Sequence, residues 1–213
     1  MNADEMVIRR EMVVICQRLY DKDIVPANGG NVSVRLASGE VLVSPTGRAL
    51  ADATPEWFVK VDLDGNKLAG DLEPSCETPT HTFIYRRRPD VHGVIHGHPP
   101  FATAMALAGE RFGPPSHPEA FVYVGEVAWI DYATPATLAD HLAGFVERHD
   151  AFLLGNHGAL TLGSSLKQAH FCMESLEMHA RAITLAKIWG GAKPLPQEAV
   201  EQLDKLRRKL KSR

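Results

Sequence analysis

Two histidines separated by one glycine form the clearest chemical feature of the sequence. His96 and His98 close the apolar pattern of residues 94–98, which reads as a β-strand. Side chains two positions apart on a strand point to the same face, so both imidazoles can bind one ion. His157 follows a second apolar run, residues 152–154, and is itself followed by a glycine. Imidazoles delivered by strand ends predict an open divalent-metal site.

Glu77 is the carboxylate that such a site would use. It directly precedes Thr78 and Pro79, which predict a helix that runs to about Arg88. Backbone N–H groups at a helix start favour a nearby anion. On spacing alone, the three histidines can also be satisfied polar residues near a core, and Glu77 can be a cap residue. The default interpretation of the other histidines is a structural role, with His117 as the exception. They are His81, His92, His117, His141, His149, His170 and His179.

Three loops with small polar residues lead into strands or helices. Backbone N–H groups in such turns can surround phosphate oxygens. Any one of the loops can equally be a plain turn, but three of them near a carboxylate favour a phosphate pocket. The segments are Asn28-Gly29-Gly30-Asn31, Ser44-Pro45-Thr46-Gly47 and Pro74-Ser75-Cys76-Glu77.

The elements that must position these groups mix strands and helices along one chain. The patterns predict helices over residues 5–20, 78–88, 102–107, 134–149 and 165–189. They predict strands over residues 32–36, 41–43, 58–63, 91–98, 121–130 and 151–154. Tight hairpins early in the chain favour an α/β domain whose sheet is at least partly antiparallel. The basic tail, residues 205–213, is expected to be a solvated helix end.

Composition predicts an ordinary soluble globular protein. The chain has 213 residues, 45% hydrophobic and 23% charged, which suits a single domain. A net charge of -3 gives no electrostatic reason to expect nucleic acid, and no run of 18 apolar residues predicts a membrane span. The opening segment lacks a signal-peptide core. The widely spaced Cys16, Cys76 and Cys172 fit neither a disulfide framework nor a CxxC metal site, which favours a cytoplasmic location.

Taken in order, these pieces resemble the class II aldolase/adducin family from about residue 5 to about residue 190. The resemblance implies a three-layer αβα sandwich around a largely antiparallel central sheet. It implies one domain over residues 1–213 with a helical tail from about residue 196. The matching motifs are Gly30-Asn31-Val32-Ser33-Val34-Arg35, Ser44-Pro45-Thr46-Gly47, Pro74-Ser75-Cys76-Glu77, His81 with Tyr85 and Arg88-Pro89-Asp90, His96-Gly97-His98, Tyr132-Ala133-Thr134 and Asn156-His157-Gly158.

The resemblance also implies roles for individual residues. In the sugar-phosphate aldolases of the family, the histidines that match His96, His98 and His157 bind Zn²⁺. The acid that matches Glu77 ligates the resting metal and then acts as general acid/base. The metal is a Lewis acid that stabilises an enediolate, and the sequence does not select Zn²⁺ over Mn²⁺ or Fe²⁺. The positions that hold the substrate phosphate match Gly30, Asn31, Thr46, Gly47, Ser75 and Cys76.

Two departures from the family pattern concern the substrate. The fuculose-phosphate aldolases have a hydroxyl residue where this chain has Cys76, which weakens one phosphate contact. Their active-site tyrosine, contributed across the subunit interface, falls near Ser116-His117-Pro118. His117 then either replaces that tyrosine as proton donor or indicates different chemistry, and the nearest other phenols are Tyr123 and Tyr132.

The resemblance favours retro-aldol cleavage of a small ketose phosphate, such as fuculose 1-phosphate, to dihydroxyacetone phosphate and an aldehyde. The alternative is metal-dependent decarboxylation of a sugar-acid phosphate or another keto acid, because the same electron sink supports both reactions. A non-catalytic module of the adducin-head type is disfavoured, since those heads lack the metal ligands. We expect a cytoplasmic homotetramer with active sites at subunit interfaces, which binds neither nucleic acid nor membranes.

Overall fold

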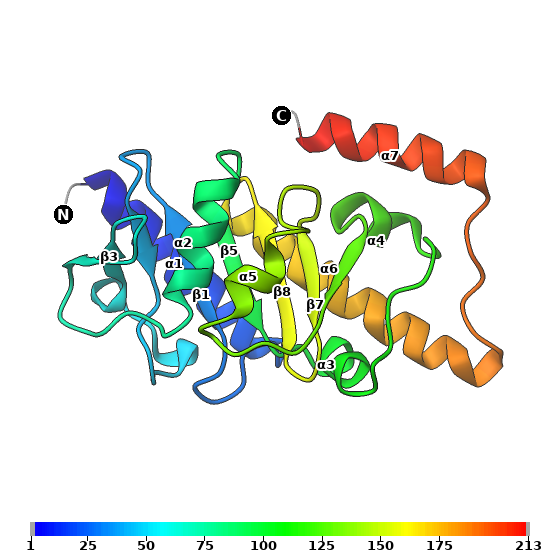
Figure 1. Ribbon diagram of the computed structural model, residues 1–213, viewed down its shortest axis with the longest axis horizontal. Helices are drawn as coiled ribbons and strands as arrows, with labels where there is room; N and C mark the ends of the chain where they lie inside the picture. The colour runs from blue at the N-terminus through cyan, green and yellow to red at the C-terminus, as the bar shows by residue number, and fades with distance from the viewer. Residues whose placement is uncertain (1–2, 212–213) are drawn as a thin grey trace.

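The computed structural model describes residues 3–211 and contains a mixed sheet of eight strands (Figure 1). The strand order is β4-β3-β2-β1-β5-β8-β7-β6. Only β6 and β7 pair in parallel within the described residues, so the sheet is largely antiparallel, as predicted. The strands are β1 (Asn31–Arg35), β2 (Val41–Val43), β3 (Val59–Val61), β4 (Lys67–Ala69), β5 (Gly93–Gly97), β6 (Val127–Ile130), β7 (Ala151–Leu154) and β8 (Gly158–Gly163).

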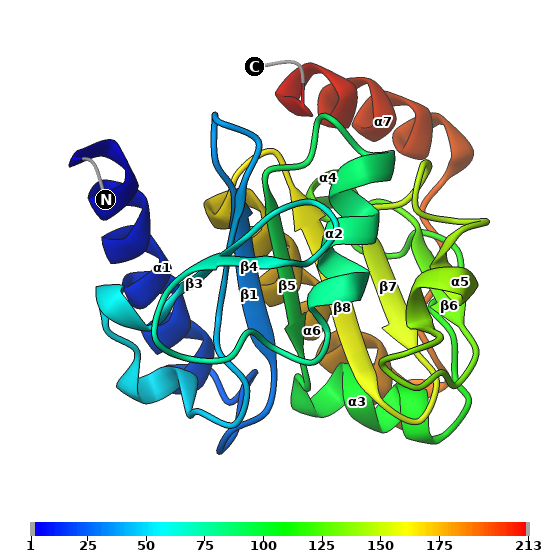
Figure 2. The same cartoon turned by 60° about the vertical axis from the view of Figure 1, so that its left-hand side comes forward.

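Helices cover both faces of this sheet. One apolar cluster joins α1 and α6 to one face, and a second joins α2 and α5 to the other. Figure 2 shows α2 and α5 in front of the sheet and α6 behind it. The three-layer αβα architecture is therefore confirmed. The helices are α1 (Ala3–Asp21), α2 (Thr78–Arg87), α3 (Pro100–Leu107), α4 (Pro118–Tyr123), α5 (Leu138–Leu142), α6 (Leu166–Ala186) and α7 (Gln197–Lys211), with 3-10 turns at 50–52, 55–57 and 187–189.

Alternation along β1 and β5 decides which side chains face α2. Val32 of β1 packs with α1 and α6, whereas its neighbour Ser33 bonds to side chains of α2. Val94 of β5 packs in the α2 layer. Because strand side chains alternate, His96 points to the same side as Val94. The start of α2, where Glu77 lies, therefore faces His96.

The strand predicted over residues 121–130 is wrong in its first half. The chain forms α4 there and enters β6 only at residue 127. Pro118 occupies a first-turn position of the helix, where proline costs no hydrogen bond. Ala120 and Val124 are both buried at a spacing of four, but this helical period is hidden within an apolar run. Gly125, with a φ of 74°, follows the helix.

Other boundaries also differ from the predictions. The helix predicted over 134–149 is regular only in α5, and the chain loosens into turns around Gly144, a poor helix former. α2 starts at Thr78, as predicted, and Glu77 occupies its N-cap position. The sequence patterns missed β4 and β8.

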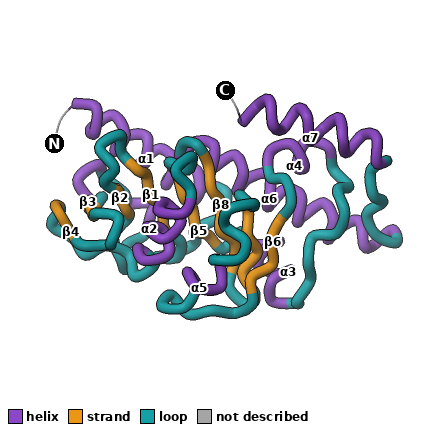
Figure 3. Tube along the Cα trace, turned by 45° about the horizontal axis from the view of Figure 1, so that its top comes forward, coloured by secondary structure: helices purple, strands orange, loops and turns teal. Residues whose placement is uncertain are grey.

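The C-terminal helix α7 packs against α4 after a loop that starts with two glycines at positive φ, Gly190 and Gly191 (Figure 3). Arg207 of α7 donates to the Asp150 carboxylate at 3.0 Å, and Arg88 donates to the other carboxylate oxygen at 2.8 Å. The predicted helical tail is thus held by a buried carboxylate. Residues 212–213 of that tail lie outside the described residues. No helix between residues 3 and 211 has the length and apolarity to cross a bilayer.

Candidate metal centre

The three predicted histidines meet at one edge of the sheet. His96 lies in β5, His98 follows the last residue of that strand, and His157 lies in the turn between β7 and β8. Because β8 pairs with β5, the turn that carries His157 lies beside the end of β5. One ligand nitrogen from each ring lies within 4.8 Å of the other two. This spacing allows all three to bind one ion.

The ring of His96 is oriented for metal binding. Its Nδ1 lies 3.0 Å from the carbonyl oxygen of Ala159, so Nδ1–H donates there and the lone pair stays on Nε2. Nε2 lies 3.7 Å from Oε2 of Glu77, and Nε2 of His157 lies 4.0 Å from Oε1. The two histidines and the carboxylate therefore face a common point.

Burial keeps these imidazoles neutral. It lowers the pKa of His98 to about 4, with the neighbouring His96 as a second cause. Burial likewise lowers the pKa of His96 and His157, although the Glu77 charge opposes the shift in both. A histidine ligand must be unprotonated, so the donor set fits a divalent ion.

Glu77 is a buried, ionised carboxylate. Burial by itself raises its pKa, but the electrostatic interaction with the nearby His96 ring and a hydrogen bond from Asn31 outweigh this effect and the pKa is lowered. The Asn31 amide donates to Oε2 at 2.8 Å, and Asn31 pairs with His96 across β1 and β5. The Ser75 hydroxyl accepts the backbone N–H of Glu77 at 3.2 Å. Sequence reasoning placed Asn31 and Ser75 only in a phosphate pocket and missed these contacts.

The three polar loops do come together around Glu77. The backbone N–H of Ser75 donates to the carbonyl oxygen of Ser44 at 3.1 Å, and the backbone N–H of Thr46 donates to the carbonyl oxygen of Glu73 at 3.0 Å. These two amide groups are therefore occupied within the protein. Gly30 packs against the His96 backbone at a positive φ of 75°, where a Cβ would lie 2.8 Å from the His96 oxygen. Three exposed residues remain open to a ligand. Thr46 and Cys76 offer their side chains, and Gly47 offers its backbone.

His117 lies apart from the three histidines of its own chain. Its Nδ1 accepts the N–H of Ala120 at 3.3 Å, and its ring lies 6.3 Å from that of His179. It lines a cavity of about 550 Å³ between α4, α6 and the start of α3. The alternative phenols, Tyr123 and Tyr132, are exposed.

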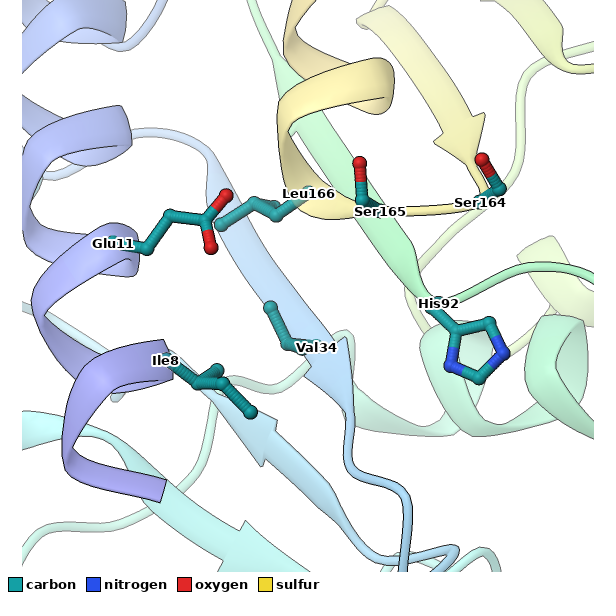
Figure 4. A pocket seen from close by; sticks show the side chains of 7 residues that line it. All are labelled: Ile8, Glu11, Val34, His92, Ser164, Ser165 and Leu166. Carbon is teal, nitrogen blue, oxygen red and sulfur yellow. The ribbon is translucent and has the colours of Figure 1, made fainter. Parts of the chain in front are cut away.

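A second cavity, of about 320 Å³, lies at the other end of β5 (Figure 4). His92, just before the strand, and Ser165, the cap of α6, line it together with Glu11 of α1. It contains none of the predicted site residues.

Residues 10–184 match the model of a protein family described as the class II aldolase and adducin N-terminal domain. The chain belongs to this family. The resemblance predicted from the ordered motifs is therefore confirmed. The match to the class II aldolase family runs from α1 to α6, so α7 lies beyond the matched residues.

Known class II aldolase relatives differ in their reactions. The L-fuculose phosphate aldolase of Methanocaldococcus jannaschii is 32% identical over 179 residues, 83% of this chain and 96% of its own. The 3-oxo-tetronate 4-phosphate decarboxylase of Pectobacterium atrosepticum is 34% identical over 187 residues, 85% of each chain. A solved structure of an L-fuculose 1-phosphate aldolase has a TM-score of 0.88 at 30% identity and covers 99% of this chain and 98% of its own.

Burial of His81 on α2 predicts acid sensitivity. Burial lowers its pKa to about 4, and an unfolded histidine titrates near 6.5. The unfolded chain binds more protons between these values, so stability falls as the pH falls through this range. His81 alone contributes about 3 kcal/mol to this loss. Urea unfolding of chelator-treated protein at pH 7 and pH 4.5 measures it, and a His81→Asn variant should lose less stability over the same range. An equal loss in both proteins would contradict the prediction.

Proposed function

We propose that this protein is a metal-dependent lyase that cleaves a small ketose phosphate, of the fuculose 1-phosphate kind, to dihydroxyacetone phosphate and an aldehyde. The observation that carries the proposal is the convergence of three neutral histidines on an ionised carboxylate, at 3.7 and 4.0 Å from two of them. Membership of a family that contains sugar-phosphate aldolases supports it.

His96, His98 and His157 would hold the ion, with Glu77 as a fourth ligand in the resting state. We propose Zn²⁺, since a site of histidines and one carboxylate suits it, with Mn²⁺ and Fe²⁺ as the other candidates. When bound, the ion supplies a Lewis acid that stabilises negative charge on the substrate carbonyl oxygen.

Glu77 would move the proton during the reaction. Its low pKa keeps it ionised and able to accept a proton, and its position at the start of α2 fixes it beside the histidines. Asn31 orients it through the 2.8 Å hydrogen bond to Oε2. Glu77 is thus placed to transfer the proton of the carbon next to the carbonyl in either direction.

The polar loops would bind the substrate phosphate. We assign this role to Gly30, Asn31, Thr46, Gly47, Ser75 and Cys76, with the exposed Thr46, Gly47 and Cys76 making the direct contacts. Asn31 and Ser75 act mainly through Glu77, because their side chains already bond to it.

Phosphorylated ketoses should be cleaved far faster than the free sugars. A substrate without phosphate lacks the hydrogen bonds between the loop donors and the charged phosphate oxygens, each of which contributes about 1.5–3 kcal/mol. Thr46→Val should raise the KM for the phosphorylated substrate about 5- to 10-fold and leave kcat nearly unchanged. An assay coupled to dihydroxyacetone phosphate detection measures both. Equal turnover of free and phosphorylated ketoses would contradict the assignment of the loops.

Decarboxylation of a phosphorylated keto acid is the second candidate. It is favoured by the decarboxylase relative, which is 34% identical over 85% of this chain. The same assay series separates the two reactions. Metal-dependent release of carbon dioxide from a β-keto acid, with no cleavage of any ketose phosphate, would establish the decarboxylase.

We further propose a cytoplasmic homotetramer whose active sites lie at subunit interfaces. Ile188 and Trp189, in the 3-10 turn that follows α6, are 72% and 80% exposed in the single chain, as expected for residues that a second subunit covers. His117 would then serve as a proton donor to a neighbouring subunit's site. Light scattering of the purified protein tests the assembly.

A further inference from the structure

Three successive contacts join β1 to α2 directly behind the proposed metal site. Asn31 bonds to Glu77, Ser33 bonds to His81, and Arg35 bonds to the backbone of Tyr85. Successive contacts are two residues apart on the strand and four residues apart on the helix. Two residues of a strand and four residues of a helix advance by nearly the same distance. Glu77 and His81 therefore occupy neighbouring steps of one contact series.

The hydrogen bonds around Ser33 determine which nitrogen of His81 carries the hydrogen. Ser33 Oγ lies 2.6 Å from His81 Nδ1 and 2.8 Å from the Tyr85 hydroxyl. Among the described residues, Ser33 Oγ is the only hydrogen-bond partner of the Tyr85 hydroxyl, so the buried hydroxyl hydrogen has no other acceptor. Tyr85 therefore donates to Ser33, and Ser33 donates to Nδ1 of His81. In a neutral imidazole, the hydrogen then resides on Nε2.

That Nε2–H group is buried without a hydrogen-bond partner among the described residues. A buried unpaired donor is costly, so its persistence calls for a partner in another state of the site. His81 lies one helical turn after Glu77, and its backbone N–H donates to the Glu77 carbonyl at 3.2 Å. Side chains at this spacing on a helix reach each other. Here the Glu77 carboxylate is instead turned toward His96 and His157.

We propose that His81 is a positioning residue whose Nε2–H holds the Glu77 carboxylate once that group turns away from His96 and His157 to meet the substrate. The proposal rests on the proposed function of Glu77. Glu77 then has two positions, one beside the metal ligands and one beside His81. Tyr85 and Ser33 act on the reaction only through His81, because they fix its tautomer.

Two substitutions at position 81 separate this role from a structural one. In His81→Asn the shorter amide keeps a partner for Ser33 but loses the distant donor. In His81→Gln the longer amide keeps a donor near the place of Nε2. We expect His81→Asn to lower kcat about 10- to 100-fold, with KM for the ketose phosphate and the zinc content unchanged. His81→Gln should stay within about 3-fold of the parent kcat.

His170→Asn is the matched control. His170 is a histidine as deeply buried as His81 but lies on α6, with Glu174, Arg18 and Lys22 as its charged neighbours. We expect His170→Asn to lose as much thermal stability as His81→Asn but to keep its kcat. The loss of kcat in His81→Asn would then result from the place of His81 beside Glu77 and not from the loss of a buried histidine. A His81→Asn variant with normal kcat, or with a kcat above that of His81→Gln, would overturn the proposal.

Nitrogen-15 NMR of histidine-labelled, full-length protein tests the proposal without substrate. The His81 signals, identified by their loss in His81→Asn, should show the neutral Nε2–H tautomer. A hydrogen on Nδ1 would overturn the proposal whatever the substrate is. Failure of the parent protein to cleave any ketose phosphate would refute the proposed function instead and leave this tautomer test standing.

Discussion

Replacing His157 with alanine should weaken zinc binding strongly and abolish ketose-phosphate cleavage while the fold persists. The free energy of a structural zinc site is about 10–16 kcal/mol over four ligands, so one ligand accounts for about 3 kcal/mol. Zinc affinity should therefore fall at least about 100-fold. His157 lies in an accessible turn, and its side chain is 27% exposed, so its removal leaves little cavity. Metal analysis after gel filtration and the coupled cleavage assay measure the two losses.

His96→Ala should have the same effect on zinc and activity at a larger cost in stability. The His96 ring is buried and bonds to the Ala159 carbonyl, so its removal leaves both a cavity and an unpaired acceptor. His141→Ala on the exposed face of α5 is the control and should keep both metal and activity. Stoichiometric zinc with full turnover in the His157→Ala protein would rule out the metal centre.

Glu77→Gln should lower kcat by roughly 10²–10⁴, the usual contribution of a positioned proton-transfer group. Glutamine has the shape of glutamate and can still accept the hydrogen bond from Asn31. The three histidines should keep the metal, so zinc content separates chemistry from binding. Glu77 also occupies the N-cap position of α2, where its side chain makes no capping hydrogen bond. A Glu77→Gln enzyme with near-normal kcat would show that this position is only a helix start.

Short-range pattern predicted the parts of the fold that have a buried and an exposed face or a fully buried run. The strands around Val32, Val41 and Phe152 and the long helix α6 are of this kind. β4 was missed because all three of its residues are exposed, so no apolar alternation marks it. α4 was mistaken for a strand because its apolar residues form a continuous run, which has no clear period.

The candidate site likewise contains residues whose role the local sequence predicted and residues whose contacts it did not. The histidines and Glu77 were found because each stands beside a strand end or a helix start. Asn31 was predicted only to bind phosphate. Its hydrogen bond to Glu77, 46 residues away in the chain, could not be predicted because it depends on β1 lying beside α2. The contacts of Ser33 with His81 and Tyr85 span about the same separation and were equally invisible. Local sequence reports the chemical type of a residue, whereas its partner is fixed by the packing of distant elements.

The start of α1 and the end of α7 both lie at the end of the sheet opposite the one where β5 leads, through His98, into α3 (Figures 1 and 2). A surface linkage or fusion partner joined at either end therefore extends away from the loops that would receive the substrate. The protein can be immobilised on a bead through the end of α7, so that the strand ends that carry the three histidines face the flowing solution. An immobilised preparation of this kind should keep the KM of the free protein.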